Sequence, residues 1–169
     1  MSLSTYLVRP SRCALVNVRT GEHVECLFNP PQLLEKVQVH WNRQVVLGLS
    51  HQVLQYQSTG NRTFGPLDFY LDRFFARAMD QDADVMAFAT FMRALTVPAV
   101  GASGISTGAP PRTLIVWPNV MTVEAVVTEL EMKFTDFARD GSVLLYTAAC
   151  GFEEILDVRR DAPTDEVTA

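Results

Sequence analysis

Apolar and polar residues alternate along much of the chain, which is typical of β-strands that bury one face. The longest alternating run covers about 121–134, and a turn signal, Asp140-Gly141, follows it. The alternation resumes between Leu144 and Phe152, so the two runs predict a long antiparallel ribbon. Its first strand is expected to place Val126, Thr128, Leu130, Met132 and Phe134 on one face, and Glu129, Glu131 and Lys133 on the other.

Shorter runs of the same kind come before this ribbon. The segment Phe28-Asn-Pro-Pro31 interrupts them, because proline cannot donate to a β-ladder and Asn-Pro favours a turn. The predicted strands cover 13–18, 22–27, 36–41, 51–60, 67–72 and 112–117.

The middle of the chain has helical spacing. Residues 80–95 place Val85, Phe88, Met92 and Leu95 on one stripe, and Asp80 or Asp82 could cap its N-terminus. Residues 100–112 are rich in Gly, Ser and Pro and are expected to form a surface loop.

These elements predict a mainly β fold with one substantial helix. We expect an antiparallel β-sandwich or small barrel in a single domain, 1–156, followed by a polar tail, 157–169.

Composition narrows the possible partners. The 169 residues carry a net charge of −5, and no basic stripe is visible, so nucleic acid is not expected as the main partner. The sequence shows no signal peptide and no apolar run of about 20 residues, so we expect cytoplasmic synthesis and no membrane insertion. Cys13, Cys26 and Cys150 lack metal-ligand spacing and are expected to be buried, reduced residues.

A search for catalytic chemistry returns no strong motif. His23, His40 and His51 lie in separate predicted strands without companion ligands. Residues 80–84, D-x-D-x-D, lack the glycine and glutamate of a calcium loop, and 100–112 lacks the lysine of a phosphate-binding loop. Glu129 and Glu131 could form an acid/base pair, but a solvated strand face explains them more simply. No catalytic residue, cofactor or metal is predicted.

Several segments, in their order along the chain, resemble one known family. They are LFNPPQL at 27–33, LSHQVLQYQSTG at 49–60, GPLDFYLDRF at 65–74, PPRTLIVW at 110–117 and the ribbon at 123–154. Together they resemble the tube-like domain of contractile injection system proteins over about residues 12–155. Trp117 is followed by Pro118, where the family usually has glycine, so the backbone there departs from the pattern.

The resemblance implies a structural, non-enzymatic subunit of a contractile injection system or phage tail baseplate. In this family, sheets of neighbouring subunits join around a channel, which implies a homo-oligomeric ring, expected to be a hexamer. The chain looks most like the adaptor that joins the inner tube to the central spike, with tube, spike and baseplate proteins as partners. Such particles assemble in the cytoplasm and are then released or docked at a membrane. Adaptors of this type often continue into a LysM-like module, and no such segment is recognisable in this sequence.

The resemblance also suggests site residues. The expected subunit interface comprises Phe28, Asn29, Pro30, Leu47, Leu49, His51 and Tyr56. The expected channel-facing residues are Glu129, Glu131 and Lys133, with Val126, Leu130, Met132 and Phe134 facing the core.

One alternative stays open at this point. A soluble β-barrel could bind a small ligand or act as an enzyme through a pocket reached past the 100–112 loop. What fills the interior distinguishes the two hypotheses, and the apolar inward faces favour a packed core. A peptidoglycan-binding module is the least favoured alternative.

Overall fold

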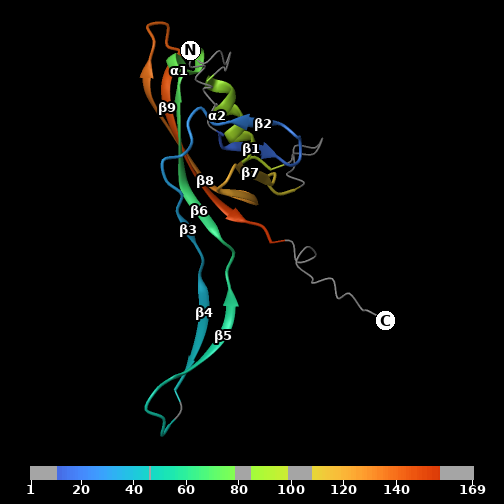
Figure 1. The fold of residues 1–169 in the computed structure, drawn as a ribbon, viewed down its shortest axis with the longest axis vertical. Coiled ribbons are helices and arrows are strands. Elements are labelled where there is room, and N and C mark those ends of the chain that lie inside the picture. Colours follow the sequence, from blue (N-terminus) through green and yellow to red (C-terminus); the bar gives the residue numbers. More distant parts are fainter. Residues whose placement is uncertain (1–10, 46, 79–84, 99–107, 157–169) are drawn as a thin grey trace, which may run out of the picture.

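A computed structural model describes residues 11–45, 47–78, 85–98 and 108–156. These residues form nine strands and two short helices (Figure 1). The strands are β1 (Ala14–Asn17), β2 (His23–Glu25), β3 (Glu35–Lys36), β4 (Val39–Gln44), β5 (Val53–Thr59), β6 (Thr63–Asp72), β7 (Thr113–Trp117), β8 (Met121–Phe137) and β9 (Val143–Glu154). The helices are α1 (Arg73–Ala78) and α2 (Val85–Ala94).

Seven of the strands form one antiparallel sheet in the order β2-β1-β7-β8-β9-β6-β3. The predicted ribbon is its longest part, because β8 and β9 pair from Ala125 opposite Glu154 to Phe137 opposite Val143. The predicted turn joins them: Gly141 has a φ of 81°, and its N–H donates to the carbonyl of Ala138 at 2.9 Å. The mainly β, antiparallel fold class is therefore confirmed.

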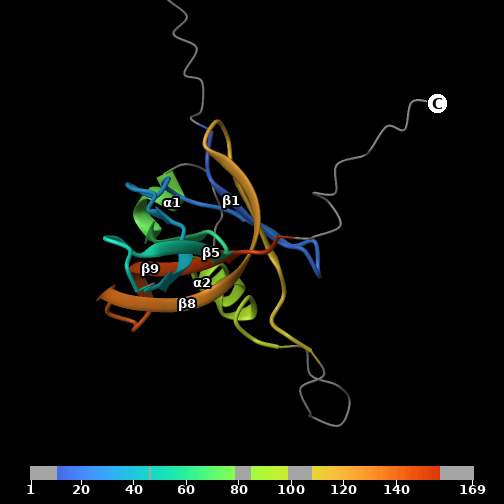
Figure 2. The ribbon, with the colours of Figure 1, turned by 90° about the horizontal axis from the view of Figure 1, so that it is seen from below.

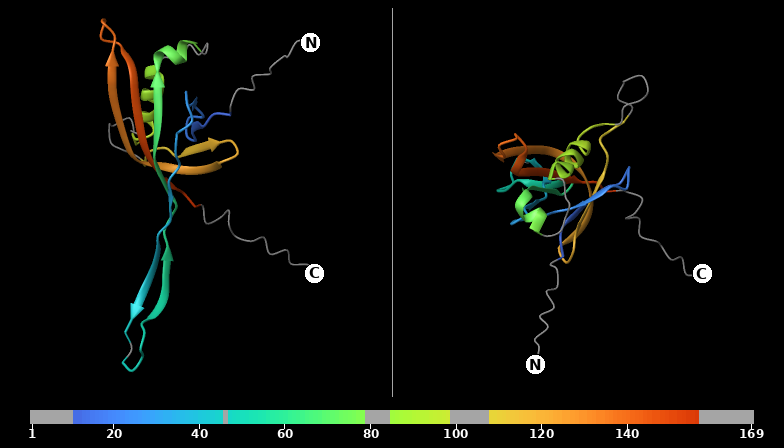
Figure 3. Two further views of the ribbon diagram at one scale, coloured as in Figure 1. Left: turned by 60° about the vertical axis from the view of Figure 1, so that its left-hand side comes forward. Right: turned by 90° about the horizontal axis from the view of Figure 1, so that it is seen from above.

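The sheet bends in the middle of β8, where the strand leaves the β1–β7 part and joins β9 and β6 (Figure 3). A register shift between Val127 and Glu129 marks this bend, as expected for a β-bulge. Before the bulge, the buried residues are Val123 and Ala125, and after it the core side is taken by even-numbered residues such as Leu130. The prediction that Val126 shares the core face with Leu130 is wrong, because one extra residue in a strand moves every later side chain to the opposite face.

Helix α2 packs against the sheet and closes the core. Phe88 of α2 lies against Phe69 of β6, with 5.7 Å between ring centroids. The hydroxyl of the fully buried Tyr146 on β9 donates to the carbonyl oxygen of Val85 at 2.6 Å. This contact joins the first turn of the helix to the centre of the sheet.

Of the helix predicted over residues 80–95, the structure shows Val85–Ala94 as α2. Val85, Phe88 and Met92 are buried on one stripe, as expected. The structure adds a second helix, α1, which directly follows β6 and was not predicted. The predicted cap at Asp80 or Asp82, most of the 100–112 loop and the 157–169 tail lie outside the described residues.

Strands β4 and β5 form a separate two-stranded ribbon, the arm, which projects away from the body (Figure 1). The arm continues the line of β3 and β6 (Figure 1), and seen from below it lies to one side of β1 (Figure 2). At the base of the arm, the backbone N–H of Gly60 donates to the carbonyl oxygen of Gln38 at 2.8 Å and joins the two chain segments.

An ion pair holds the chain where the arm meets the body. The guanidinium of Arg62 donates through both Nε, at 2.6 Å, and Nη2 to the carboxylate of Glu154, which is largely buried. A weaker contact joins Arg62 to Glu35 on β3 at 3.4 Å. These hydrogen bonds, led by those to Glu154, raise the pKa of Arg62 further above its already high ordinary value. The bidentate geometry fixes the start of β6 against the end of β9.

Candidate assembly surfaces

The arm has two chemically different faces. One face, here called the apolar face, carries the pair Trp41–Tyr56 and, two pairs further along the ladder, Leu54 opposite Arg43. The rings of Trp41 and Tyr56 meet edge to face, with centroids 5.7 Å apart. The opposite face carries the amide side chains of Gln44 and Gln55, which hydrogen-bond to each other at 3.0 Å.

Nothing within the described part of the chain covers the apolar face. Trp41 is 51% exposed, Tyr56 60% and Leu54 55%. A two-stranded ribbon is marginally stable in water, and exposed apolar surface of this kind marks an interaction site.

The tip of the arm continues this pattern. Leu47 is fully exposed, and Leu49 and His51 are also exposed. Gly48 between the two leucines has a φ of 93°, which a side chain would disfavour, so the tip turn depends on glycine. The structure therefore brings four of the seven predicted interface residues, including Tyr56, together on the arm.

The other three predicted interface residues, Phe28, Asn29 and Pro30, lie at the body instead. The Phe28 ring packs edge to face on Phe75 of α1 at 5.5 Å, and both rings remain exposed at one side. Asn29 is used within the chain: its Oδ1 accepts from the backbone N–H of Cys13 at 2.7 Å. Pro30 is buried.

The charged face of the ribbon lies on the side of β8 away from α2. Glu129, Glu131 and Lys133 are all exposed there. On the neighbouring strand β9, Ala149 pairs with Glu131 and Thr147 pairs with Lys133. These smaller residues therefore lie on the same face, beside the charged side chains.

Two further residues complete this face from the next strand. Asp68 of β6 pairs with Ala149, and Tyr70 pairs with Thr147. Neither residue was predicted for this face, although the alternation of 67–72 places both on the side of the strand opposite the buried Leu67 and Phe69. The alternation therefore indicated which face of β6 these residues occupy. It did not indicate that β6 would pair with β9.

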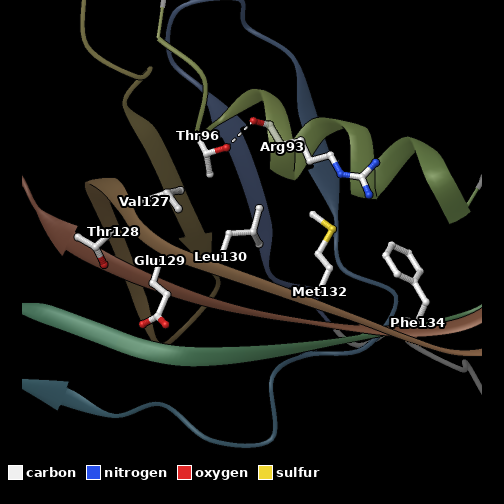
Figure 4. Close-up of a pocket in the computed structure, with 8 residues that line it drawn as sticks. All are labelled: Arg93, Thr96, Val127, Thr128, Glu129, Leu130, Met132 and Phe134. Carbon is white, nitrogen blue, oxygen red and sulfur yellow. Dashed lines mark hydrogen bonds between the residues drawn. The ribbon is translucent and has the colours of Figure 1, made fainter.

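A pocket of about 610 Å³ opens between α2 and β8 (Figure 4). Met132, Leu130 and Phe134 point into it from β8, and Glu129 points to the other side of the strand (Figure 4). The guanidinium of Arg93 lies 6.0 Å from the centroid of the Phe134 ring, within cation–π range. The residues that line the pocket are Arg93, Thr96, Val127, Thr128, Glu129, Leu130, Met132 and Phe134.

The end of the ribbon is fixed by local hydrogen bonds. Both the side chain and the backbone N–H of Ser142 donate to the Asp140 carboxylate, at 2.7 and 3.0 Å, and lower its pKa. Arg73 of α1 donates to the Ser142 hydroxyl at 3.0 Å. The hairpin turn and α1 therefore hold each other at this end of the molecule.

Within the described ranges, no three His, Cys, Asp or Glu side chains gather closely enough to hold a metal ion. Of the two described helices, neither has the length and apolar character needed to cross a membrane.

A mainly β antiparallel sheet with an exposed two-stranded arm is compatible with a structural protein. Comparison with protein families agrees: the model of the family described as contractile injection system tube protein matches residues 14–162. The chain belongs to this family, and its resemblance to it is confirmed. It is a structural component of a contractile injection system and assembles there with other subunits. A search of curated proteins found no match.

Proposed function

We propose that this chain is the adaptor that joins the inner tube of the particle to its central spike, as a closed ring of six copies. The tube protein, the spike protein and baseplate proteins are its partners, and assembly takes place in the cytoplasm before release or membrane docking. Membership of the tube family supports the structural part of this proposal.

The single observation that carries the proposal is the uncovered apolar face of the arm. Trp41, Tyr56 and Leu54 are half exposed on a ribbon that has no core of its own. Covering a large apolar side chain fully is worth roughly 1.5–3 kcal/mol, so a neighbour that covers these three gains several kcal/mol. The tip residues Leu47 and Leu49 extend the same contact.

The two ends of the large sheet supply a second contact. Strands β2 and β3 are its edges in the described part of the chain, and both are short. Unpaired strand edges accept strands from neighbours, and a closed ring removes them. Phe28 packs against Phe75 of α1 and stays exposed at one side, so we assign it, with the exposed Asn29, to this second contact; Pro30 is buried within the subunit and offers no surface there.

In the ring, the charged face of the ribbon lines the channel. Glu129, Glu131 and Lys133 remain solvated there at little cost, whereas in a packed interface they would need charged partners. Asp68 and Tyr70 of β6 belong to the same channel surface by register.

A matched pair of arm variants tests the ring. Trp41→Asp places a charge on the apolar face, and Gln44→Asp places the same charge on the opposite face of the same strand. We expect both variants to keep the wild-type circular dichroism spectrum, and only Trp41→Asp to lose ring formation in light scattering and negative-stain microscopy. Equal loss in both variants, or rings in both, would show that the apolar face is not the contact.

Copy number tests the adaptor role separately. An adaptor occurs as one ring per particle whatever the particle length, whereas a repeating tube protein scales with length. Quantitative mass spectrometry of purified particles is expected to give about six copies of this chain per particle, as the proposed single ring requires. A number that rises with tube length would assign the chain to the repeating tube instead.

A further inference from the structure

Two of the three cysteines lie directly opposite each other on neighbouring strands. The register of β1 and β2 pairs Ala14 with Glu25, and its continuation places Cys13 opposite Cys26. The backbone confirms this continuation, because the N–H of Cys26 donates to the carbonyl of Cys13 at 2.8 Å. The Cα atoms of a hydrogen-bonded antiparallel pair are about 5.5 Å apart, which is within the range that a disulfide spans.

The two side chains also share one environment. Both are buried on the core side of the sheet, with exposed fractions of 0% and 1%. A hydrogen bond between the two thiols lowers the pKa of Cys13 and raises that of Cys26 well above its ordinary value. The thiols are thus in contact and free.

We propose that Cys13 and Cys26 form a cross-strand disulfide when the protein meets a disulfide oxidant. The Cys13 thiolate attacks one sulfur of the oxidant and displaces a thiolate. The Cys26 thiolate then attacks the Cys13 sulfur of this mixed disulfide and displaces the second thiolate. The protein loses two protons and two electrons, and the oxidant becomes two thiols.

The position of the pair gives the bond a structural consequence. Strand β2 has three residues and is an edge of the sheet, so it opens locally at low cost and admits the oxidant. The chain leaves the sheet just after Cys26, and Asn29 already holds the backbone of Cys13 and Ser11. A disulfide would fix this exit and keep β2 paired with β1.

The third cysteine provides an internal control. Cys150 is fully buried in the middle of β9, and burial raises its pKa to about 12. The central strand that carries it lies between β8 and β6 and does not open as an edge strand does. It is expected to stay a free thiol under conditions that oxidise the other two.

The experiment uses the purified full chain, incubated with oxidised glutathione and then analysed without reductant. We expect the intact mass to fall by two hydrogens, and a tryptic digest to link peptide 13–19 to peptide 20–36. Cys150→Ala is expected to give the same link, and Cys26→Ala none. The oxidised chain should melt roughly 5–10 °C higher than the reduced chain, as expected for a closed loop of about 14 residues, and dithiothreitol should reverse the gain.

Three results would overturn the inference. They are three free thiols after oxidation, a link that involves Cys150, and a link formed only between two copies of the chain. The measurement is made on the isolated chain, so it is independent of the proposed adaptor role.

Discussion

The hydroxyl of Tyr146 offers a precise test of how α2 is held on the sheet. Tyr146→Phe removes one oxygen atom and leaves the ring in place, so the packing of β9 is preserved. The lost contact is the 2.6 Å hydrogen bond to the carbonyl of Val85, inside a fully buried environment. Deleting one partner of a buried hydrogen bond costs about 1–2 kcal/mol, because the remaining acceptor loses a partner that water cannot replace.

Tyr70→Phe is the matched control. Tyr70 lies on the other face of the sheet, in register with Thr147, the residue that follows Tyr146, and is exposed. The same chemical change there is expected to alter the free energy of unfolding by less than about 0.5 kcal/mol. Both variants and the wild type would be compared by urea unfolding at one low protein concentration, so that association does not contribute.

The reasoning is refuted if the two variants have the same stability. A loss of about 1–2 kcal/mol in Tyr146→Phe corresponds to a fall in melting temperature of roughly 2–8 °C for a chain of this size. An unchanged Tyr146→Phe would mean that α2 is held by its apolar stripe alone.

Two further predictions concern the sheet. Gly65→Ala is expected to destabilise the protein far more than Gly21→Ala in thermal unfolding. Both glycines have positive φ, but only at Gly65 would the new Cβ lie 2.7 Å from the carbonyl oxygen of Cys150; equal losses would refute this. Phe134→Asp is expected to destabilise the fold strongly, because it removes a ring that packs against Tyr146 and puts a charge on the core-facing side of β8, whereas Glu131→Lys should fold normally and change only assembly or channel charge. Circular dichroism after expression separates the two, and an unfolded Glu131→Lys would contradict the assignment of the faces.

Much of the fold could be predicted from local patterns. The ribbon β8–β9, its turn at Asp140-Gly141 and the apolar stripe of α2 are each encoded within a few neighbouring residues. The bulge near Thr128 could not be predicted, because Val126, Val127 and Thr128 are each compatible with either face of a strand. A prediction that assumes strict alternation along the whole strand therefore places Val126 on the wrong face of β8.

The arrangement of elements that are distant in the sequence also could not be predicted. The strands of the arm were predicted, but nothing local says that they leave the sheet and pair only with each other. Helix α1 was missed because its six residues include two exposed phenylalanines, Phe74 and Phe75, which do not follow a helical stripe. The pairing of β6 beside β9 brings Asp68 and Tyr70 to the charged face, and this proximity is a property of topology rather than of sequence.

The cysteines illustrate the same point. Their spacing along the chain suggested three separate buried thiols, and burial is confirmed for all three. That Cys13 and Cys26 face each other follows from the β1–β2 register, which depends on the turn at Gly21. A hairpin was predicted here, and extending its register by one pair would have revealed the contact.

Electron cryo-microscopy of the intact particle, at a resolution that shows side chains, tests the central claim most directly. The account predicts one ring of this chain between tube and spike, with Trp41 and Tyr56 of each arm covered by a neighbouring subunit and Glu131 facing the channel. A particle in which the apolar face of the arm remains in solvent, or in which the charged face is packed against another protein, would contradict it.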